Sequence, residues 1–430
     1  MDERTAVALI RFGLGRRGAE TLPADPAAWL AAQLDGADPA LAAPGAGSAE
    51  GLAALAADWQ DRRAGGQPAR VRTLFDAEAD AATDVLLATE APFRERLVWF
   101  WANHFTVSLR RPPLRAVVFA YLREAIRPHV TGRFADLLLA VARHPAMLMY
   151  LDNAASIGPD SPAGRRGHRG LNENFARECL ELHTIGRDAG YTQADVTAFA
   201  AVLTGWGLVR RGTARGFTFF PERHQPGAKT VMGRTWPEGE QGGVLALRWL
   251  GTHPATYRRI ATKLTRHFVA DDPPAGAVRR VAAMLHDSGG DLRAASLALL
   301  DLPASWQKMG KLRTPFDYAV AVLRALDLPP DVRPKLAGVT ARLGQPLFTA
   351  PLPDGWADTA ADWADGELLL RRADWASGVA GHAAGLDPAE VAAATLGPLL
   401  GDATMQAVRR AGSRREALAL LFAAPEYQRR

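Results

Sequence analysis

The sequence has a single cysteine, Cys179, among its 430 residues. A lone cysteine excludes an internal disulfide and fits a reducing compartment. It falls on the apolar side of a predicted helix, where a buried and unreactive thiol is commoner than a nucleophile. We therefore expect Cys179 to be a core residue.

Long apolar runs are also absent. No stretch approaches the roughly 18 residues of a membrane-spanning helix, so we expect no membrane span. The opening residues, MDERTAVALIRFGLG, lack the basic region and the long apolar region of a signal peptide. We therefore expect a soluble, cytoplasmic protein, although the sequence leaves an extracytoplasmic location open.

Clustered positive charge is a third absence. The net charge is only +5, and the basic residues are dispersed. A nucleic-acid-binding protein usually gathers its basic residues on one surface, so we expect no nucleic-acid partner. The densest basic stretch, GRRGHRG at 164–170, lacks the GK[ST] ending and the preceding strand of a phosphate-binding loop. We interpret it as a solvated loop, and an anion held near the start of the next helix is the alternative.

Lysine is scarce as well, with five lysines among the 51 lysine and arginine residues. Ammonium and guanidinium groups differ in size, hydration and pKa range, so a lysine kept in an arginine-rich chain is a candidate for a specific role. Lys229 and Lys263 also lie in the motifs quoted below, and we select them as binding residues. We attribute Lys308 and Lys335 to chance.

One stretch is crowded with polar groups, LNENFARECLELHTIGRDAGYTQADVTAFAAVLTGW at 171–206. It predicts two helices joined by a glycine turn. The first helix, 172–185, interleaves amides, carboxylates, an arginine and a histidine with apolar residues, whereas a surface helix would spread such groups over one wide face. The composition therefore indicates a hydrogen-bonded site, with Asn174, Arg177, Glu178, Glu181 and His183 as its candidates.

The angular positions on this helix restrict the chemistry. At about 100° per residue, Asn174, Glu178 and Glu181 share one face, and His183 lies on the opposite side. Arg177 stands one turn before Glu181 and supplies its charge partner. A di-iron or di-manganese centre needs Glu-x-x-His on one face, so such a centre is not favoured.

His183 has a second interpretation. It occupies the last turn before Gly186, a predicted C′ glycine, where the helix dipole favours an imidazolium. The alternatives are therefore a site histidine and a capping histidine. After the turn, Thr192-Gln-Ala-Asp195 resembles a capping box and predicts the start of the next helix.

Helical periodicity covers most of the chain. The clearest strand signal is the segment 216–220, which we pair with 229–234 as a hairpin. The sequence therefore predicts a mainly α, large and globular helical protein with one short β-hairpin insertion. Without a clear linker, we divide the chain into an N-terminal helical region, 1–215, and a region of hairpin and C-terminal helices, 216–430.

Family resemblance rests on NENFARE-x-LELHT-x-G, GYTQADV and LTGW, which resemble the signature of the bacterial family catalogued as domain of unknown function 1800. The resemblance spans nearly the whole chain, with Cys179 where the family usually has leucine. It implies no particular reaction, but a sulfatase-like companion family often encoded beside its members implies a partner. Further matching segments are LIRFGLG near the start, WFWANHF (99–105), HPAMLMYLDN (144–153), the run at 217–229, HPATYRRIATKL (253–264), KLRTPFDY (311–318) and LGQPLF…GW (343–356).

Three further polar clusters are candidates for the same site. His104 ends the aromatic helix RERLVWFWANHF. His144 starts another predicted helix, and Asp152 ends it. His224 and Lys229 flank a predicted turn, where loops commonly carry function. Each residue alone is more often structural, but together they favour a shared pocket.

Two functions are consistent with such a pocket. In the first, a hydrolase or group transferase acts on an anionic or polymer-linked substrate, with Glu178 as general base and His104 or His183 as proton partner. In the second, the polar network is structural and the protein is a non-catalytic binding or assembly partner of the sulfatase-like protein. A divalent metal on Asp152, Glu178 and histidines of other helices stays open but is not favoured. The candidates are Glu178, His104, His183 and Asp152 for catalysis and Asn174, Arg177, Glu181, His144, His224, Lys229 and Lys263 for substrate binding.

A geometric expectation follows from the helix angles. The face of Asn174, Glu178 and Glu181 should look into a cleft. That cleft should also receive His104 or His144, together with at least one of the two selected lysines.

Overall fold

The chain is described by a computed structural model of residues 1–430, in which positions 19, 44, 168–169, 211, 213–214 and 308 lie outside the described residues. The mainly α fold is confirmed, because helices follow one another along the chain and the described strands form only two small sheets. No helix within this described part is long and apolar enough to cross a membrane. The expectations for Lys308 and for the end of the basic stretch fall on positions outside the description.

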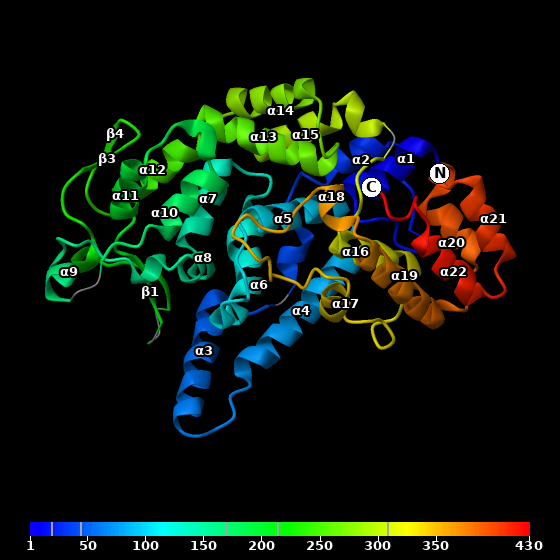
Figure 1. Cartoon of the computed structure of the whole chain (residues 1–430), viewed down its shortest axis with the longest axis horizontal. Coiled ribbons are helices and arrows are strands. Elements are labelled where there is room, and N and C mark those ends of the chain that lie inside the picture. Colours follow the sequence, from blue (N-terminus) through cyan, green and yellow to red (C-terminus); the bar gives the residue numbers. More distant parts are fainter. Residues whose placement is uncertain (19, 44, 168–169, 211, 213–214, 308) are drawn as a thin grey trace.

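The aromatic helix predicted around 92–107 is α5, and it lies at the centre of the molecule (Figure 1). Its side chains are buried on nearly every face, including Phe93, Leu97 and Trp101. Two long helices, α3 and α4, pack against each other and project from the rest of the molecule (Figure 1). The helices of this part are α1 (Glu3–Val7), α2 (Pro26–Ala32), α3 (Ser48–Arg63), α4 (Arg70–Ala88), α5 (Pro92–His104), α6 (Val118–Tyr121), α7 (Phe134–Arg143), α8 (Pro145–Tyr150) and α9 (Pro162–Arg166).

The middle of the chain covers one side of α5. Figure 1 shows α13, α14 and α15 as a layer there, and α13 packs closely on α14. The polar stretch of the sequence folds into α10 and α11, which pack on each other. The helices are α10 (Asn174–Glu178), α11 (Gln193–Val202), α12 (Glu240–Gly251), α13 (Pro254–Phe268), α14 (Ala275–Asp287) and α15 (Leu292–Leu300).

The strand pairing differs from the prediction. The strand β2 (Gly216–Phe219) pairs antiparallel with β1 (Trp206–Val209), upstream of it, and not with the segment that follows. That later segment forms a separate hairpin of β3 (Lys229–Val231) and β4 (Arg234–Trp236). The expectation of one hairpin at 216–234 was therefore wrong. The reason is a two-residue turn between β3 and β4, in which Met232 and Gly233 both have positive φ angles, 51° and 73°.

Several helices begin with residues that are typical of helix N-termini. Pro26, Pro145 and Pro254 each stand in the first turn of their helices. Thr192 and Asp195 form the predicted capping box at the start of α11, with side chain and backbone bonded in both directions. These local signals fix where helices begin, because they satisfy N–H groups that lack partners within the helix.

Two hydrophobic clusters fill the interior. The first collects buried side chains from Ala8 to Leu302, and the second is built mainly from residues after Met309. Cys179 is fully buried in the first, in agreement with its expected core position. The division of the chain near residue 215 stays a prediction. The C-terminal helices are α16 (Pro315–Leu326), α17 (Leu336–Arg342), α18 (Ala360–Trp363), α19 (Gly366–Ala380), α20 (Pro388–Thr395), α21 (Asp402–Arg410) and α22 (Arg414–Ala423).

Buried ion pairs connect α5 with the C-terminal part. An Arg96 Nη1 atom lies 3.1 Å from Asp317 Oδ1, and Arg430 Nε lies 3.1 Å from the other oxygen of the same carboxylate. Burial raises the pKa of Asp317, but the two guanidinium groups hold it well below its usual range. One carboxylate thus pairs with two buried cations from different parts of the chain.

We predict that Asp317→Asn lowers the free energy of unfolding by about 3–5 kcal/mol, because two buried guanidinium groups lose their shared counter-charge. Urea denaturation at pH 7 measures this loss. Asp301→Asn is the control, since the Asp301 carboxylate is 67% exposed and its pair with Arg280 spans 4.0 Å; its loss should stay below about 1 kcal/mol. Equal losses in the two variants would contradict the assigned role of the buried pair.

Candidate functional site

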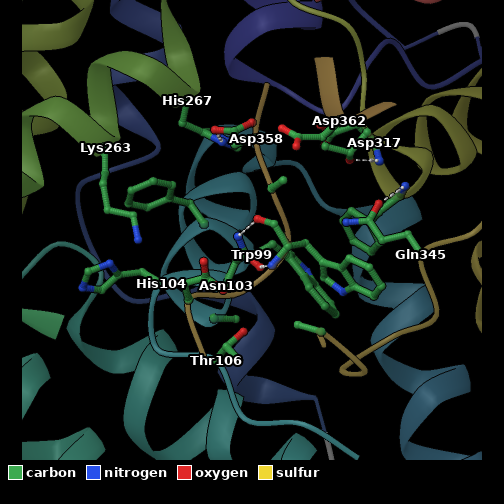
Figure 2. Close-up of a pocket in the computed structure, with 18 of the residues that line it drawn as sticks. Trp99, Asn103, His104, Thr106, Lys263, His267, Asp317, Gln345, Asp358 and Asp362 are labelled. Atoms are coloured by element: carbon green, nitrogen blue, oxygen red, sulfur yellow. Dashed lines mark hydrogen bonds and ion pairs between the residues drawn. The ribbon is translucent and has the colours of Figure 1, made fainter. Parts of the chain in front are cut away.

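A cavity of about 420 Å³ lies where α5, α13, the start of α16 and the segment 345–362 meet (Figure 2). This segment is irregular up to the start of α18. Aromatic rings and charged groups line the cavity together. In Figure 2, Lys263 and His104 lie at one end, Gln345 and Asp317 at the other, and Trp99 and Asn103 between them. The charged or imidazole-bearing lining residues are Arg96, His104, Arg259, Lys263, Arg266, His267, Asp317, Asp354, Asp358 and Asp362.

The Lys263 ammonium lines the cavity and is not paired with a carboxylate of the described residues. Lys229, Lys311 and Lys335 each bond to a neighbouring side chain, whereas the Lys263 ammonium has no hydrogen-bond or ion-pair partner among the described residues. Burial, followed by the charge of Arg259, lowers the pKa of Lys263 to about 8. The cavity therefore holds an ammonium that is available to an anion.

His104 lies beside that ammonium and is 1% exposed. Its Nε2 atom lies 3.2 Å from the backbone carbonyl oxygen of His183, and its Nδ1 atom has no partner among the described residues. Since a carbonyl only accepts, the neutral ring carries its proton on Nε2. Burial, then the charge of Lys263, moves the pKa of His104 well below its usual value. This histidine is therefore uncharged and forms one wall of the cavity.

The closest carboxylate–imidazole pair in the cavity joins His267 and Asp358. His267 Nδ1 donates to Asp358 Oδ2 over 2.8 Å, and Nε2 has no partner in the described structure. Burial lowers the pKa of His267 to about 4, although the Asp358 carboxylate acts in the opposite direction. Burial likewise raises the pKa of Asp358, but surrounding positive groups lower it to about 2. At neutral pH the pair is a neutral imidazole oriented by an ionised carboxylate.

Sequence reasoning missed this pair. The two residues are separated by 91 positions, and Asp358 lies in a segment with no regular structure. One signal was present: Lys263 and His267 are four positions apart on a predicted helix, so both face the same side. The choice of Lys263 could therefore have led to His267, which was not among the predicted residues.

The segment 345–362 is held in place by side chains of other elements. Asn103 donates to the Trp356 carbonyl (2.9 Å) and accepts from the Trp356 N–H (2.8 Å). Phe348 has a φ of 52°, in the left-handed region that bulky residues avoid, and its ring packs on Trp99. Such backbone strain persists where the surroundings fix it, and it is often found at functional sites.

The helix that carried the angular argument is not uniform. After α10, residues Cys179–His183 form a π turn, and the Gly186 N–H bonds to the Leu180 carbonyl at 2.9 Å. A π turn rotates less per residue than an α-helix, so His183 reaches the apolar side and not the opposite one. It is 1% exposed, and burial lowers its pKa to about 3. Of the two alternatives for His183, the charged capping imidazolium is therefore contradicted.

The other predicted residues of this helix lie outside the cavity lining. Asn174, Glu178 and Glu181 do not contribute to it, and the expected cleft on their face stays a prediction. Arg177 bonds to Glu173 at 3.0 Å and lies 4.0 Å from Glu181. Burial raises the pKa of Glu178, as does the charge of Glu181. The network of carboxylates and arginine is thus largely a surface feature.

The remaining candidates occupy three separate places. His144 caps α8 by accepting from the Ala146 N–H, and its other nitrogen contacts Glu124. Asp152 forms an ion pair with Arg111. His224 and Lys229 bond to each other below the hairpins, where the His224 ring also accepts from the Gly239 N–H. None of these four candidates lines the cavity, so of the predicted residues His104 and Lys263 are the two that meet there.

Metal ligands are not gathered in the described part of the chain. No group of three or more His, Cys, Asp or Glu side chains is arranged there to hold a metal ion. Asp152 and Glu178, the carboxylates considered for such a site, lie apart from the cavity histidines.

The fold and the cavity define a mainly α-helical protein with a charged, aromatic-walled site. Residues 7–429 match the family described as Protein of unknown function (DUF1800), and the chain belongs to this family. Comparisons with curated proteins and with solved structures find no match. Segments that carried the family resemblance, 99–105, 253–264, 311–318 and 343–356, each contribute to the cavity lining.

We predict that Lys263→Met stabilises the protein at pH 7 by on the order of 1–3 kcal/mol, because it removes a buried charge that has no partner. The folded pKa of about 8 lies below the usual lysine pKa of 10.5. The gain in stability should therefore be full below pH 8, decrease between pH 8 and 10.5, and vanish above pH 10.5. Thermal melts across this pH range measure it, with Lys335→Met, on the surface, as the variant that should show no gain. A destabilised Lys263→Met protein would reveal an unrecognised partner.

We predict that Arg177→Ala and Glu181→Ala each cost less than about 1 kcal/mol, since their ion pairs are part-exposed. Chemical denaturation of both variants provides the measurement. A loss near that of Asp317→Asn would place the network in the interior.

Proposed function

We propose that the protein is a hydrolase or group transferase that acts on an anionic substrate in the cavity. The observation that carries the proposal is the presence, in one cavity, of a carboxylate-oriented imidazole and an unpaired ammonium, His267 and Lys263. In this proposal His267 is the general base. Lys263 holds the anionic group of the substrate.

The imidazole is oriented by a carboxylate, as a general base often is, and its other nitrogen is buried without a partner among the described residues. Asp358 accepts the Nδ1 proton of His267, which leaves a lone pair on Nε2. The carboxylate is held in turn by Arg430, 2.9 Å away, and by Lys311, whose Nζ also donates to the Asp358 carbonyl at 2.6 Å. These contacts support the proposal because a base must keep its orientation when substrate binds.

The ammonium supplies the complementary charge. Burial and the charge of Arg259 depress its pKa, and a bound carboxylate or phosphate would supply a direct counter-charge. In a site shielded from water, such a cation also stabilises negative charge that develops during reaction. Aromatic rings from Trp99, Phe348 and Trp356 form apolar walls of the same cavity.

The reaction is written for an ester. His267 Nε2 takes a proton from water as the water oxygen bonds to the ester carbonyl carbon, giving a tetrahedral oxyanion. The bond to the leaving oxygen then breaks, and His267 returns the proton to it. The products are one carboxylic acid and one alcohol. If an alcohol replaces water, the same steps transfer the acyl group.

We predict a bell-shaped pH dependence of kcat/KM for hydrolysis of an anionic test ester, mono-p-nitrophenyl glutarate. Below pH 4 protonation removes the His267 lone pair, and above pH 8 deprotonation removes the Lys263 charge. His267→Asn keeps an N–H toward Asp358 but has no basic nitrogen, so kcat should fall about 10²-fold or more. Lys263→Met should lower kcat/KM for this anionic ester and leave kcat/KM for neutral p-nitrophenyl acetate unchanged.

His286→Asn is the matched control, because His286 is exposed, lies outside the cavity lining and contacts Asp287 and Tyr257. Its activity should equal that of the unmodified protein. Saturable binding of glutarate without any turnover of the ester would instead favour the non-catalytic alternative, a binding partner of a sulfatase-like protein. Activity that survives in His267→Asn would reject His267 as the base.

A further inference from the structure

A second groove adjoins the cavity on the outer side of α13. It has a volume of about 430 Å³ and runs between α13 and α14. Arg266 lines both the groove and the cavity, so the two spaces share a wall. The groove is lined by Arg258, Thr262, Arg266, Asp272, Pro273, Ala275, Val278, Arg279 and Ala282.

The groove has a surplus of positive charge. Arg258 and Arg279 are exposed and have no carboxylate partner among the described residues. The Nε of Arg266 donates to a backbone carbonyl, that of Asp271, and so its charge is not neutralised there. The lining contains a single carboxylate, from Asp272. Three guanidinium groups against one carboxylate favour an anionic occupant.

The floor between these arginines is apolar and has no aromatic ring. It consists of Pro273 and the small side chains of Ala275, Val278 and Ala282. Nucleic-acid strands bind on aromatic platforms that stack with bases, and this lining offers none. A polysaccharide would gain little from an apolar floor, because its surface is hydroxylated. A peptide that combines carboxylates with small apolar side chains complements both features.

The spacing of the arginines specifies a pattern. Arg258 and Arg266 are separated by about 12 Å along α13 at the usual helical rise. An extended peptide advances about 3.4 Å per residue and alternates its side chains between two faces. Acidic residues roughly four positions apart therefore reach both arginines from one face, while the residues between them point alternately toward the floor. Guanidinium groups suit this role because they bind carboxylates in a bidentate manner.

We propose that the groove binds an extended acidic peptide segment in which acidic and small apolar residues alternate. We further infer that such a peptide carries the anionic substrate of the cavity. This second step rests on the proposed function, whereas peptide binding in the groove does not. Because Arg266 borders both spaces, a chain lying in the groove leads to the Lys263 end of the cavity.

The test measures fluorescence anisotropy of a labelled peptide of alternating glutamate and valine. The double variant Arg258→Gln/Arg279→Gln should weaken its binding about fivefold or more, as expected for the loss of two exposed ion pairs. The control is Arg248→Gln/Arg280→Gln, which removes two exposed arginines outside the groove that pair with Asp136 and Asp301. A labelled peptide of the same composition, with glutamates and valines in separate blocks, should bind more weakly than the alternating one.

Two results would overturn the inference. Equal affinity for the alternating and block peptides, with stronger binding of heparin, would show a groove that accepts any polyanion. No peptide binding in a protein that still hydrolyses the anionic ester would refute the groove and leave the proposed function standing. Conversely, Lys263→Met should retain peptide binding while losing ester selectivity, and this separates the two sites.

Discussion

The Asp358 carboxylate is the interaction on which the site depends. It is partly buried and ionised, and it contacts His267, Arg430 and Lys311 from different parts of the chain. A buried carboxylate costs several kcal/mol unless charged and hydrogen-bonded partners surround it. Meeting that requirement fixes the segment 345–362 against α13 and orients the imidazole in the same step. The neighbouring Asp317 carboxylate likewise contacts two cations, Arg96 and Arg430. The Arg430 guanidinium is therefore shared by the Asp317 and Asp358 carboxylates.

Much of the fold was predictable from local chemistry, because caps and apolar periodicity act over a few residues. The capping box of Thr192 and the first-turn prolines needed no knowledge of tertiary structure. The predicted strand pairing was wrong because a local signal was missing at one turn. The turn at Met232 lacks the Asn-Gly or Asp-Gly sequence that usually marks two positive φ angles. A strand without that signal can be assigned to either neighbour, and only packing decides which one it pairs with.

The candidate site was predictable in part. Lys263 was found from composition and His104 from its helix, and both line the cavity. The His267–Asp358 pair could not be found in the same way, since a contact across 91 positions leaves no local pattern. The π turn before His183 had a similar effect: an angular argument assumes a constant rotation per residue, and one wide turn invalidates it for every later residue. Sequence periodicity thus predicts elements better than it predicts which side chains meet.

The two hydrogen bonds between Asn103 and Trp356 also indicate where the chain can tolerate insertions and deletions. The Asn103 amide supplies one donor and one acceptor to a single residue, as a neighbouring β-strand would. Further contacts from Ser108 and Leu109 fix the segment at Ala350 and Phe348. Between these attachments lies an exposed turn around Leu352, which is 59% exposed. Changes in loop length are tolerated at such turns and rejected where the backbone is bonded. The mouth of the cavity can therefore be remodelled by insertion without disturbing the groups inside it.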